Sequence, residues 1–426
     1  MHIPPRARAW TLSRAWWMHP TLTVMLLVVP VYLSFMSFDF DQVGVPSFIP
    51  STNYWWGLML LVTLATGALM GSCVRLAPMP ARTGPLTFPA WLMALLLFLT
   101  VFAYVVWFYP IALEPDLLMQ IVQGERANLR GLIVTRPGLT TLTQCGVAYT
   151  VACAIKPWLS GKPLARWERY GLVLVFALTI FRVFVWSERL AILEIVCAYF
   201  IAGAALRPIR SYGRRRLLKL LPLIAPVIVY LLFTFTESFR SWEFYRDSYS
   251  SIWAFSFDRL LTYYATASNN GIGLLEHTHD WPGYTGRFVF EWAYLLPLAG
   301  RLLRSVFGDA RIAYQDFLEQ FAREEFNNPS GLFPIVYDVG YFGSALYFLA
   351  IGFVIGLLYR RFVAGRMSGL LGYPSCFLFM IELLRFNYFT ASRFIPVIFS
   401  LLLVALYVHR ARPPIAGGFR VVPAAS

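Results

Sequence analysis

The sequence predicts an all-α polytopic membrane protein with about ten transmembrane helices, and two observations carry this prediction. Of its 426 residues, 58% are hydrophobic and only 14% are charged, whereas soluble domains carry about 25% charged residues. Apolar runs of about 20 residues, long enough to cross a bilayer, also recur along the whole chain. We expect a helical bundle with both termini on the cytoplasmic side and one large loop outside.

Each predicted span is an apolar run between polar or basic segments. A basic segment precedes the first run, but no small-residue cleavage site follows it, so we expect a retained helix and not a signal peptide. The ten expected spans are 20–37, 53–74, 89–112, 138–155, 169–185, 189–206, 218–236, 333–358, 369–388 and 391–408.

Basic residues indicate which ends of the spans face the cytoplasm. With the N-terminus inside, the cytoplasmic segments hold 21 of the 36 Lys and Arg residues and a single acid, Glu168. This is the positive-inside pattern, and it places both termini in the cytoplasm. Topology and anionic lipid therefore explain the net charge of +14 and the Arg run at 214–216, and we expect no nucleic-acid partner.

Cysteine and histidine usage argues against a disulfide or a metal site. All five Cys residues fall in predicted spans, and none forms a CxxC pair. The segment "EHTHD" places His277 and His279 two residues apart with Glu276 and Asp280 beside them, but a metal ion needs more ligands than this. We expect no metal and no cofactor.

Loop lengths divide the chain into three parts. These are the first seven spans in 1–236, a large periplasmic loop of 96 residues in 237–332, and three further spans with a cytoplasmic tail in 333–426.

The large loop is rich in aromatic and charged residues, as in "ESFRSWEFYRDSY", and is expected to contain amphipathic helices. Its stretch "RFVFEWAYLLPLAGRLLRSVFG" is nearly apolar enough to be a span. Glu291, Pro297 and Arg301 within it favour a helix that lies on the bilayer surface instead.

Charged side chains gather at the outer ends of the predicted spans. Charges at the mouth of a bundle are costly and are functional hypotheses by default. Arginine holds phosphate oxygens by paired hydrogen bonds and stays charged when partly buried. We therefore predict an outer cavity that binds a phosphate or diphosphate on a lipid carrier, covered by the large loop. Its expected members are Arg182, Glu188, Arg189, Glu237, Arg240, Glu243, Arg246, Asp247, Asp338, Glu382, Arg385 and Arg393.

The entry to the eighth span, "EEFNNPSGLFPIVYDVGYFG", carries polar residues where an apolar run begins. The segment "NNPSG" predicts a turn that returns the loop to the membrane. Gly340 and Gly343 would thin the helix and allow close backbone approach. Asp338 would cost energy against lipid, so we expect it to face the outer cavity.

Three segments resemble Wzy-type oligosaccharide repeat-unit polymerases, and the xanthan-type exopolysaccharide polymerases among them in length and aromatic content. "FNNPSGLFPIVYDVGYFGSALYFLAIGFVIGLLYRRF" resembles their return segment, in which an Asn/Thr-rich turn leads to an Asp-x-Gly-x-x-Gly entry. "SERLAILEIV" resembles their arginine-headed span, and "DRLLTYYATASNNGIGLLEH" resembles their Tyr- and Asn-bearing loop helix. The resemblance covers residues 190–360 and the earlier spans only by topology.

The resemblance implies a bacterial inner-membrane glycosyltransferase with a GT-C-like helical architecture. Such enzymes transfer a growing glycan from undecaprenyl diphosphate to a new lipid-linked repeat unit at the periplasmic face, and so build an exopolysaccharide or O-antigen. The implied partners are the undecaprenyl-diphosphate-linked oligosaccharide, the lipid bilayer, and chain-length regulator and flippase proteins.

Residue roles follow from the motifs and from chemistry. Arg189, Arg240 and Asp338 match motif positions and are the predicted catalytic residues: the arginines would neutralise the leaving diphosphate, and Asp338 is a candidate base for the acceptor hydroxyl. Other candidate bases are Glu237, Glu276 and His277. The predicted substrate-binding residues, of which the first two rest on chemistry alone, are Arg246, Arg287, Tyr264, Asn327 and Arg385.

Four alternatives remain open at this stage. An O-antigen ligase-like transferase would rely on a histidine of the large loop, where only His277 and His279 qualify. A lipid-linked oligosaccharide flippase would carry charges through the depth of its spans, whereas Glu194 and Glu382 are the main acids within spans here. A membrane O-acyltransferase would need a histidine near a span, and His409 lies at the cytoplasmic end. A structural scaffold of an export complex would tolerate substitution of the charged residues.

Overall fold

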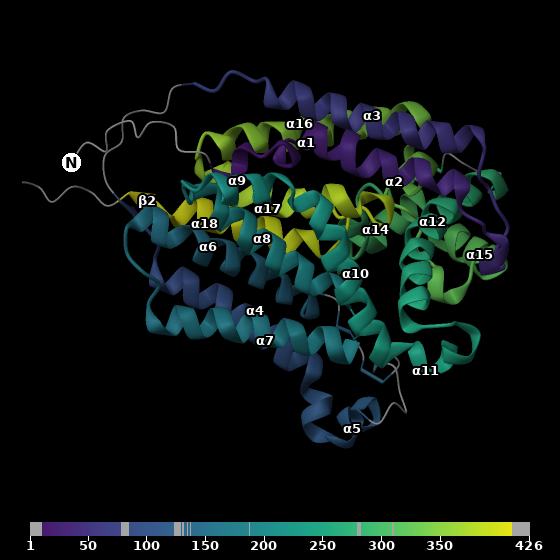
Figure 1. Ribbon diagram of the computed structural model, residues 1–426, viewed down its shortest axis with the longest axis horizontal. Coiled ribbons are helices and arrows are strands. Elements are labelled where there is room, and N and C mark those ends of the chain that lie inside the picture. Colours follow the sequence, from purple (N-terminus) through teal and green to yellow (C-terminus); the bar gives the residue numbers. More distant parts are fainter. Residues whose placement is uncertain are drawn as a thin grey trace, which may run out of the picture.

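The protein is a bundle of helices that run along its longest dimension (Figure 1). The structure, a computed structural model, describes residues 11–77, 85–122, 129, 132–133, 135–136, 138–186, 188–278, 283–308 and 311–410. One long helix, α12 (Ile252–His277), runs across one end of the bundle instead of along it (Figure 1).

Seven helical stretches of the described chain are long and apolar enough to cross a membrane, which confirms the predicted class of all-α, multi-pass membrane protein. They are Pro20–Ser37, α3 (Thr52–Ser72), α4 (Ala90–Leu113), α7 (Arg166–Trp186), Leu221–Ser238 within α10 (Leu221–Arg240), α16 (Phe333–Val363), and Met367–Leu384, which joins α17 (Met367–Ile381) to a 3-10 turn, Glu382–Leu384.

The first of these stretches is not a uniform α-helix. A π-helical turn, Val24–Val28, separates α1 (Pro20–Thr23) from α2 (Val29–Ser34). Pro30 follows directly, and because proline has no N–H and its ring crowds the preceding turn, the regular hydrogen-bond ladder is interrupted here.

The other three predicted spans form shorter helices. These are α6 (Cys145–Ser160) with 16 residues, α8 (Leu190–Leu206) with 17 and α18 (Phe394–Tyr407) with 14. All residues of α6 from Cys145 to Ile155 are buried, because α4, α7, α8, α17 and α18 surround it. A helix thus occupies each predicted span, but seven have the length to cross alone, so the count of ten stays a prediction.

Segments predicted to lie on one side of the membrane meet at one end of the bundle. The indole of Trp16 donates to the carbonyl oxygen of Lys219, at 2.9 Å, where α9 (Tyr212–Lys219) ends. Strands β1 (Leu86–Thr87) and β2 (His409–Arg410) pair antiparallel. Both α9 and β2 lie toward the end opposite α12 (Figure 1). The grouping of these segments therefore agrees with the predicted topology, whichever side each end faces.

The large loop forms a cap, defined here as residues 237–332, on the other end of the bundle. Its long helix α12 packs against α10, α15 and α16. The predicted boundary at 333 coincides with the start of α16, whereas α10 continues one turn past 236. The remaining helices of the cap are α11 (Trp242–Tyr245), α13 (Glu291–Tyr294), α14 (Pro297–Phe307) and α15 (Arg311–Phe321); α5 (Asp116–Val122) lies outside it.

The stretch predicted as one interfacial helix forms two helices, α13 and α14. Leu296 has an extended backbone (φ −73°, ψ 134°), because a residue before proline is excluded from the helical region, and α14 starts at Pro297. On α14, Leu298, Leu302 and Val306 lie four residues apart and are exposed, which is the apolar stripe expected of a helix on a bilayer surface.

The closest contact of the bundle joins α3 to α16. Glycines spaced four residues apart on both helices face the backbone of the other helix, so that neither has room for a side chain there. A Cβ atom would lie 2.2 Å from the carbonyl oxygen of Leu349 at Gly67, 2.0 Å from that of Phe353 at Gly71, 2.2 Å from that of Leu64 at Gly352 and 2.0 Å from that of Ala68 at Gly356.

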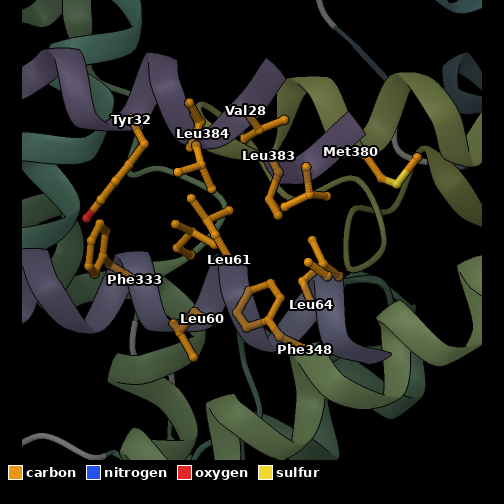
Figure 2. Packing of buried hydrophobic residues seen from close by; sticks show 14 of the residues in the cluster. Val28, Tyr32, Leu60, Leu61, Leu64, Phe333, Phe348, Met380, Leu383 and Leu384 are labelled. Carbon is orange, nitrogen blue, oxygen red and sulfur yellow. The ribbon is translucent and has the colours of Figure 1, made fainter. Parts of the chain in front are cut away.

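Buried apolar side chains fill the space between this helix pair, the first helical stretch and α17 (Figure 2). The core holds both ends and the middle of α16 against its neighbours, since Phe333, Phe348 and Phe362 are each buried. The labelled members are Val28, Tyr32, Leu60, Leu61, Leu64, Phe333, Phe348, Met380, Leu383 and Leu384.

Replacing Gly356 by leucine should lower the thermal unfolding midpoint of the detergent-solubilised protein, with a loss of about 1–3 kcal/mol, because the new side chain has to push α3 away from α16. The matched control is Gly213→Leu, since a Cβ at Gly213 meets no atom within 4 Å. Equal midpoints for the two variants would contradict this account of the contact.

Candidate functional site

Charged residues, most of them buried or half-buried, meet where the cap covers the bundle, and we call them the cap-end network. They form three groups, each centred on a glutamate. The members are Arg182, Glu188, Arg189, Glu194, Glu237, Arg259, Glu325, Glu382, Arg385 and Arg393.

The first group is centred on Glu237, whose side chain is fully buried in the last turn of α10. It forms an ion pair with Arg189, the residue that precedes α8, and another with Arg259 of α12, whose Nε lies 3.3 Å from Glu237 Oε2. Arg259 also pairs with Glu325, at 2.8 Å. The guanidinium of Arg189 stacks on Phe233, 4.0 Å from the ring centre. Glu237 therefore links α8, α10 and the cap.

The second group is centred on Glu188, in the turn between α7 and α8. Its carboxylate lies 2.5 Å from Arg182 Nη2 and 2.7 Å from Arg393 Nη1. Arg393 also contacts Glu194, at 3.3 Å, and Glu194 accepts a hydrogen bond from Gln144, at 2.8 Å. Burial opposes ionisation of Glu188, but the charges of Arg182 and Arg393 outweigh it and lower the pKa of this carboxyl below its ordinary value.

The third group is centred on Glu382, at the end of α17. Its Oε1 accepts a hydrogen bond from the hydroxyl of Tyr264 on α12, at 2.9 Å. Its Oε2 lies 3.6 Å from Arg385 Nη1, which is an ionic contact but longer than a hydrogen bond. Burial disfavours the charge of Arg385, but Glu382 and nearby tyrosines outweigh it, so its pKa is raised and the guanidinium stays protonated.

Two tyrosines connect the three groups. Tyr388 lies in the electrostatic field of both Glu194 and Glu382, and burial together with these carboxylates raises the pKa of its phenol. The ring of Tyr263 lies 6.0 Å from that of Phe233 and 5.8 Å from the guanidinium of Arg259. Tyr263 also interacts electrostatically with Arg385. Seven of the twelve charged residues predicted to converge therefore lie in one network. Asp338, Glu243, Arg246 and Asp247 lie outside it, and the side chain of Arg240 is not among those described.

A small cavity lies inside the second group. Its volume is about 10 Å³, which is room for one water molecule. Glu194, Arg393 and Tyr388 line it together with Ser375. The hydroxyl groups of Tyr388 and Ser375 are buried and have no hydrogen-bond partner among the described residues, so both are open to a polar group in the cavity.

Asp338 lies in a different place from the one predicted. It is fully buried, and its two oxygens accept three hydrogen bonds: from the hydroxyl of Thr285 at 2.8 Å and from the backbone N–H groups of Phe288 at 3.0 Å and Val289 at 3.1 Å. The expectation that it faces an outer cavity is wrong, because these donors hold it against the cap. The structure gives Asp338 an anchoring role; its predicted role as a base is untested.

Gly340 explains why glycine follows this aspartate. Its backbone (φ 71°, ψ −179°) lies in a region that only glycine adopts readily, and it makes a kink within α16. The sequence predicted a thin, regular helix here. The kink instead separates the first turns of α16, which hold the cap through Asp338, from the long part that packs on α3.

Several predicted site residues lie outside the network. Arg287 is buried beside the Asp338 anchor, where its guanidinium lies over the ring of Tyr294, 5.2 Å from the centre. Arg246 is exposed and pairs with Glu243 at 2.9 Å. Asn327 accepts a hydrogen bond at its backbone oxygen from a tyrosine hydroxyl, at 2.7 Å.

The predictions for Arg240 and Asn-bearing α12 have different outcomes. Arg240 is the last residue of α10, and its side chain lies outside the described part of the structure. On α12, Asn270 donates to the carbonyl oxygens of Phe326 and Asn328, at 2.7 and 3.2 Å. Asn270 therefore fastens the turn before α16 and Asn269 fastens the segment 46–48, whereas Tyr264 belongs to the network.

Arg259, Glu194 and Glu325 are network residues that the sequence analysis did not place in the site, and Arg259 is the cation among them. Its signal was present, because Phe255, Arg259 and Tyr263 recur every four residues and so share one face of α12. A charge in the middle of an apolar helix face needs a buried partner, but the sequence did not show that Glu237 would supply it.

The histidine required by the ligase-like alternative packs among aromatic rings. His277 lies against Phe48, Phe317 and Phe321, and its Nδ1 is 3.2 Å from the carbonyl oxygen of Gly273. His279 lies outside the described residues. Among the residues that the structure describes, no three metal-binding side chains come together. Comparisons with protein families, curated proteins and solved structures found no match.

Replacing Asp338 by alanine should lower the unfolding midpoint and expose the 283–289 segment to proteases, because an unpaired buried donor costs about 1–3 kcal/mol. Asp338→Asn should be milder, since its amide oxygen can still accept from the two backbone N–H groups. Asp247→Ala is the control, since Asp247 is 98% exposed. If Asp338→Ala has the same unfolding midpoint and the same rate of proteolysis as the wild type, Asp338 does not anchor the cap.

The contribution of Glu188 to stability should depend on pH. Because its pKa is lower in the folded protein, its ion pairs stabilise the fold above the ordinary Glu pKa of about 4.3 and are lost as pH falls through the folded value. The midpoint difference between wild type and Glu188→Gln should be largest near neutral pH and shrink in acid. Glu243→Gln, at an exposed site, should show no such trend. A difference that is constant with pH would refute the assignment.

Proposed function

We propose that this protein polymerises undecaprenyl-diphosphate-linked oligosaccharide repeat units at the periplasmic face of a bacterial inner membrane. The observation that carries the proposal is the cap-end network, in which five arginines, two of them buried and three 19–30% exposed, lie among glutamates and tyrosines where a large cap covers one end of a membrane bundle. A GT-C-like architecture belongs to the same proposal.

The network has the donors that a diphosphate needs. A guanidinium carries five N–H donors, and a single carboxylate uses at most two of them, so a paired arginine keeps donors for a phosphate oxygen. Arg385 keeps more unused N–H donors than the other arginines, because its contact with Glu382 is long and its side chain is 29% exposed. Guanidinium groups also stabilise the charge that develops on a leaving diphosphate.

The surroundings fit a ligand that is both lipid and glycan. The network lies at the ends of helices that are long and apolar enough to span a bilayer, so a polyprenyl chain can lie in the lipid while its diphosphate reaches the arginines. The exposed apolar stripe of α14 keeps the cap near the membrane surface. The cap would then lie above the glycan, and chain-length regulator and flippase proteins would act on the same substrate.

The alternatives have less support. A ligase-like transferase needs a reactive loop histidine, and the candidate that the structure describes, His277, is exposed, lies against three phenylalanine rings and belongs to none of the three groups of the network. A flippase needs charges deep in its spans, whereas Glu194 and Glu382 both belong to the network at the helix ends. A scaffold needs no buried arginines at all, and burial of so many charges is costly.

The test is reconstitution of the purified protein in liposomes with the host's undecaprenyl-diphosphate-linked repeat unit. Wild type should produce a ladder of multiples on a gel, and Arg259→Gln should lower the rate by about 100-fold, the usual loss when one charge-stabilising donor is removed. Arg215→Gln, at the opposite end of the bundle, is the control. If single repeat units cross the bilayer but are not joined, the protein is a flippase and this proposal is wrong.

A further inference from the structure

Buried polar atoms without hydrogen-bond partners occur at two points of the cap-end network. Among the described residues, they are Glu382 Oε2, Arg385 Nε and the Tyr388 hydroxyl at one point, and Glu237 Oε2 and Arg259 Nε, 3.3 Å apart, at the other. Glu382 is 4% and Tyr388 1% exposed, so bulk water does not satisfy them. An unpaired buried group costs about 1–3 kcal/mol, which indicates that a polar ligand completes these contacts during function.

Glu382 differs in this respect from three other carboxylates of the network. Both oxygens of Glu188, Glu194 and Glu325 have a hydrogen-bond donor, and the same is true of Asp338. The pairs of donors are Arg182 and Arg393 for Glu188, Gln144 and Arg393 for Glu194, and Tyr245 and Arg259 for Glu325. Glu237 Oε2, like Glu382 Oε2, has only an ion-pair contact, to Arg259. Of these two carboxylates, only Glu382 has its unpaired oxygen beside an arginine that reaches the surface, since Arg385 is 29% exposed and Arg259 is 5% exposed.

The geometry around Glu382 fixes how it would act. Tyr264 holds Oε1 by a hydrogen bond of 2.9 Å, so the carboxylate cannot turn freely and Oε2 stays directed away from this bond. Arg385, three residues further along the chain, has Nη1 3.6 Å from Oε2 and reaches the surface. A donor and an acceptor with unused capacity thus lie side by side, one for an anion and one for a hydroxyl.

We propose that Glu382 is the general base of the transfer reaction and that Arg385 holds the departing diphosphate. This inference rests on the proposed function. The acceptor sugar's O–H bond breaks and its proton moves to Glu382 Oε2, while the oxygen forms a bond to the anomeric carbon of the donor glycan. The bond from that carbon to the diphosphate oxygen breaks, and the diphosphate leaves with the electron pair, stabilised by Arg385. Asp338 takes no part in proton transfer and anchors the cap.

Three variants test this assignment in the reconstituted system. Glu382→Gln keeps an oxygen for Tyr264 but cannot accept the proton, so polymerisation should fall at least about 100-fold while binding of undecaprenyl diphosphate is unchanged. Arg385→Gln should weaken that binding about tenfold or more. Glu168→Gln is the matched control, because Glu168 is also a buried, ion-paired carboxylate but lies at the opposite end of α7 from the network.

The outcomes separate this inference from the proposed function. If wild type makes no ladder from a verified substrate, the proposed function fails. If wild type makes a ladder and Glu382→Gln stays within about threefold of it, Glu382 is not the base and polymerisation stands. If Glu382→Gln also lowers the unfolding midpoint, Glu382→Asp is the deciding variant. When the midpoint of Glu382→Asp equals that of the wild type, a rate loss of tenfold or more supports Glu382 as the base, and an unchanged rate overturns this assignment.

Discussion

The contact between α3 and α16 is the constraint on which the other parts of the structure depend. Four glycines let the two backbones touch, and no larger residue fits at these positions. In a bilayer this matters more than in water, because lipid tails are as apolar as side chains and association depends on close packing. Once α16 is fixed against α3, its kinked first turns are fixed as well. They carry Asp338, and so the position of the cap follows from a helix contact that lies some distance from it.

Buried polar groups join the apolar core in holding the cap to the bundle. Asp338 accepts three hydrogen bonds from 285–289, Asn270 donates to two backbone carbonyls before α16, and Glu237 pairs with arginines from α8 and α12. Each is nearly or fully buried. Buried polar groups of this kind have a strict geometry, because a small displacement leaves a donor or a charge unpaired at a cost of several kcal/mol, of order ~3–5 for an ion pair. The cap is therefore held in one orientation over the network.

The cap-end network contains as many glutamates as arginines, and this balance affects its chemistry. Paired charges produce little net field, so the site would not attract anions from a distance. A ligand of the proposed kind would be recognised at close range, through donors and acceptors that the pairs leave unused. Those lie at Glu382, Arg385 and Tyr388, where the cap helix, the end of α17 and the start of α18 meet. The fully paired carboxylates and arginines hold this group of residues in place, whereas the pair formed by Glu382 and Arg385 keeps capacity for the proposed reaction.

The sequence alone determined the membrane class, the placement of the helices, the cap as a separate segment, and the gathering of charges at one end, because apolar length and basic flanks are local properties of the chain. It also indicated that Gly340 and Asp338 belong together. Only the tertiary structure decided which charges pair. Asp338 is an anchor because donors from 285–289 lie within hydrogen-bond distance of it. Arg259 belongs to the network because α12 places it beside Glu237. Hydrogen-bond partners depend on distances between segments that are far apart in the sequence, and no local sequence pattern contains these distances.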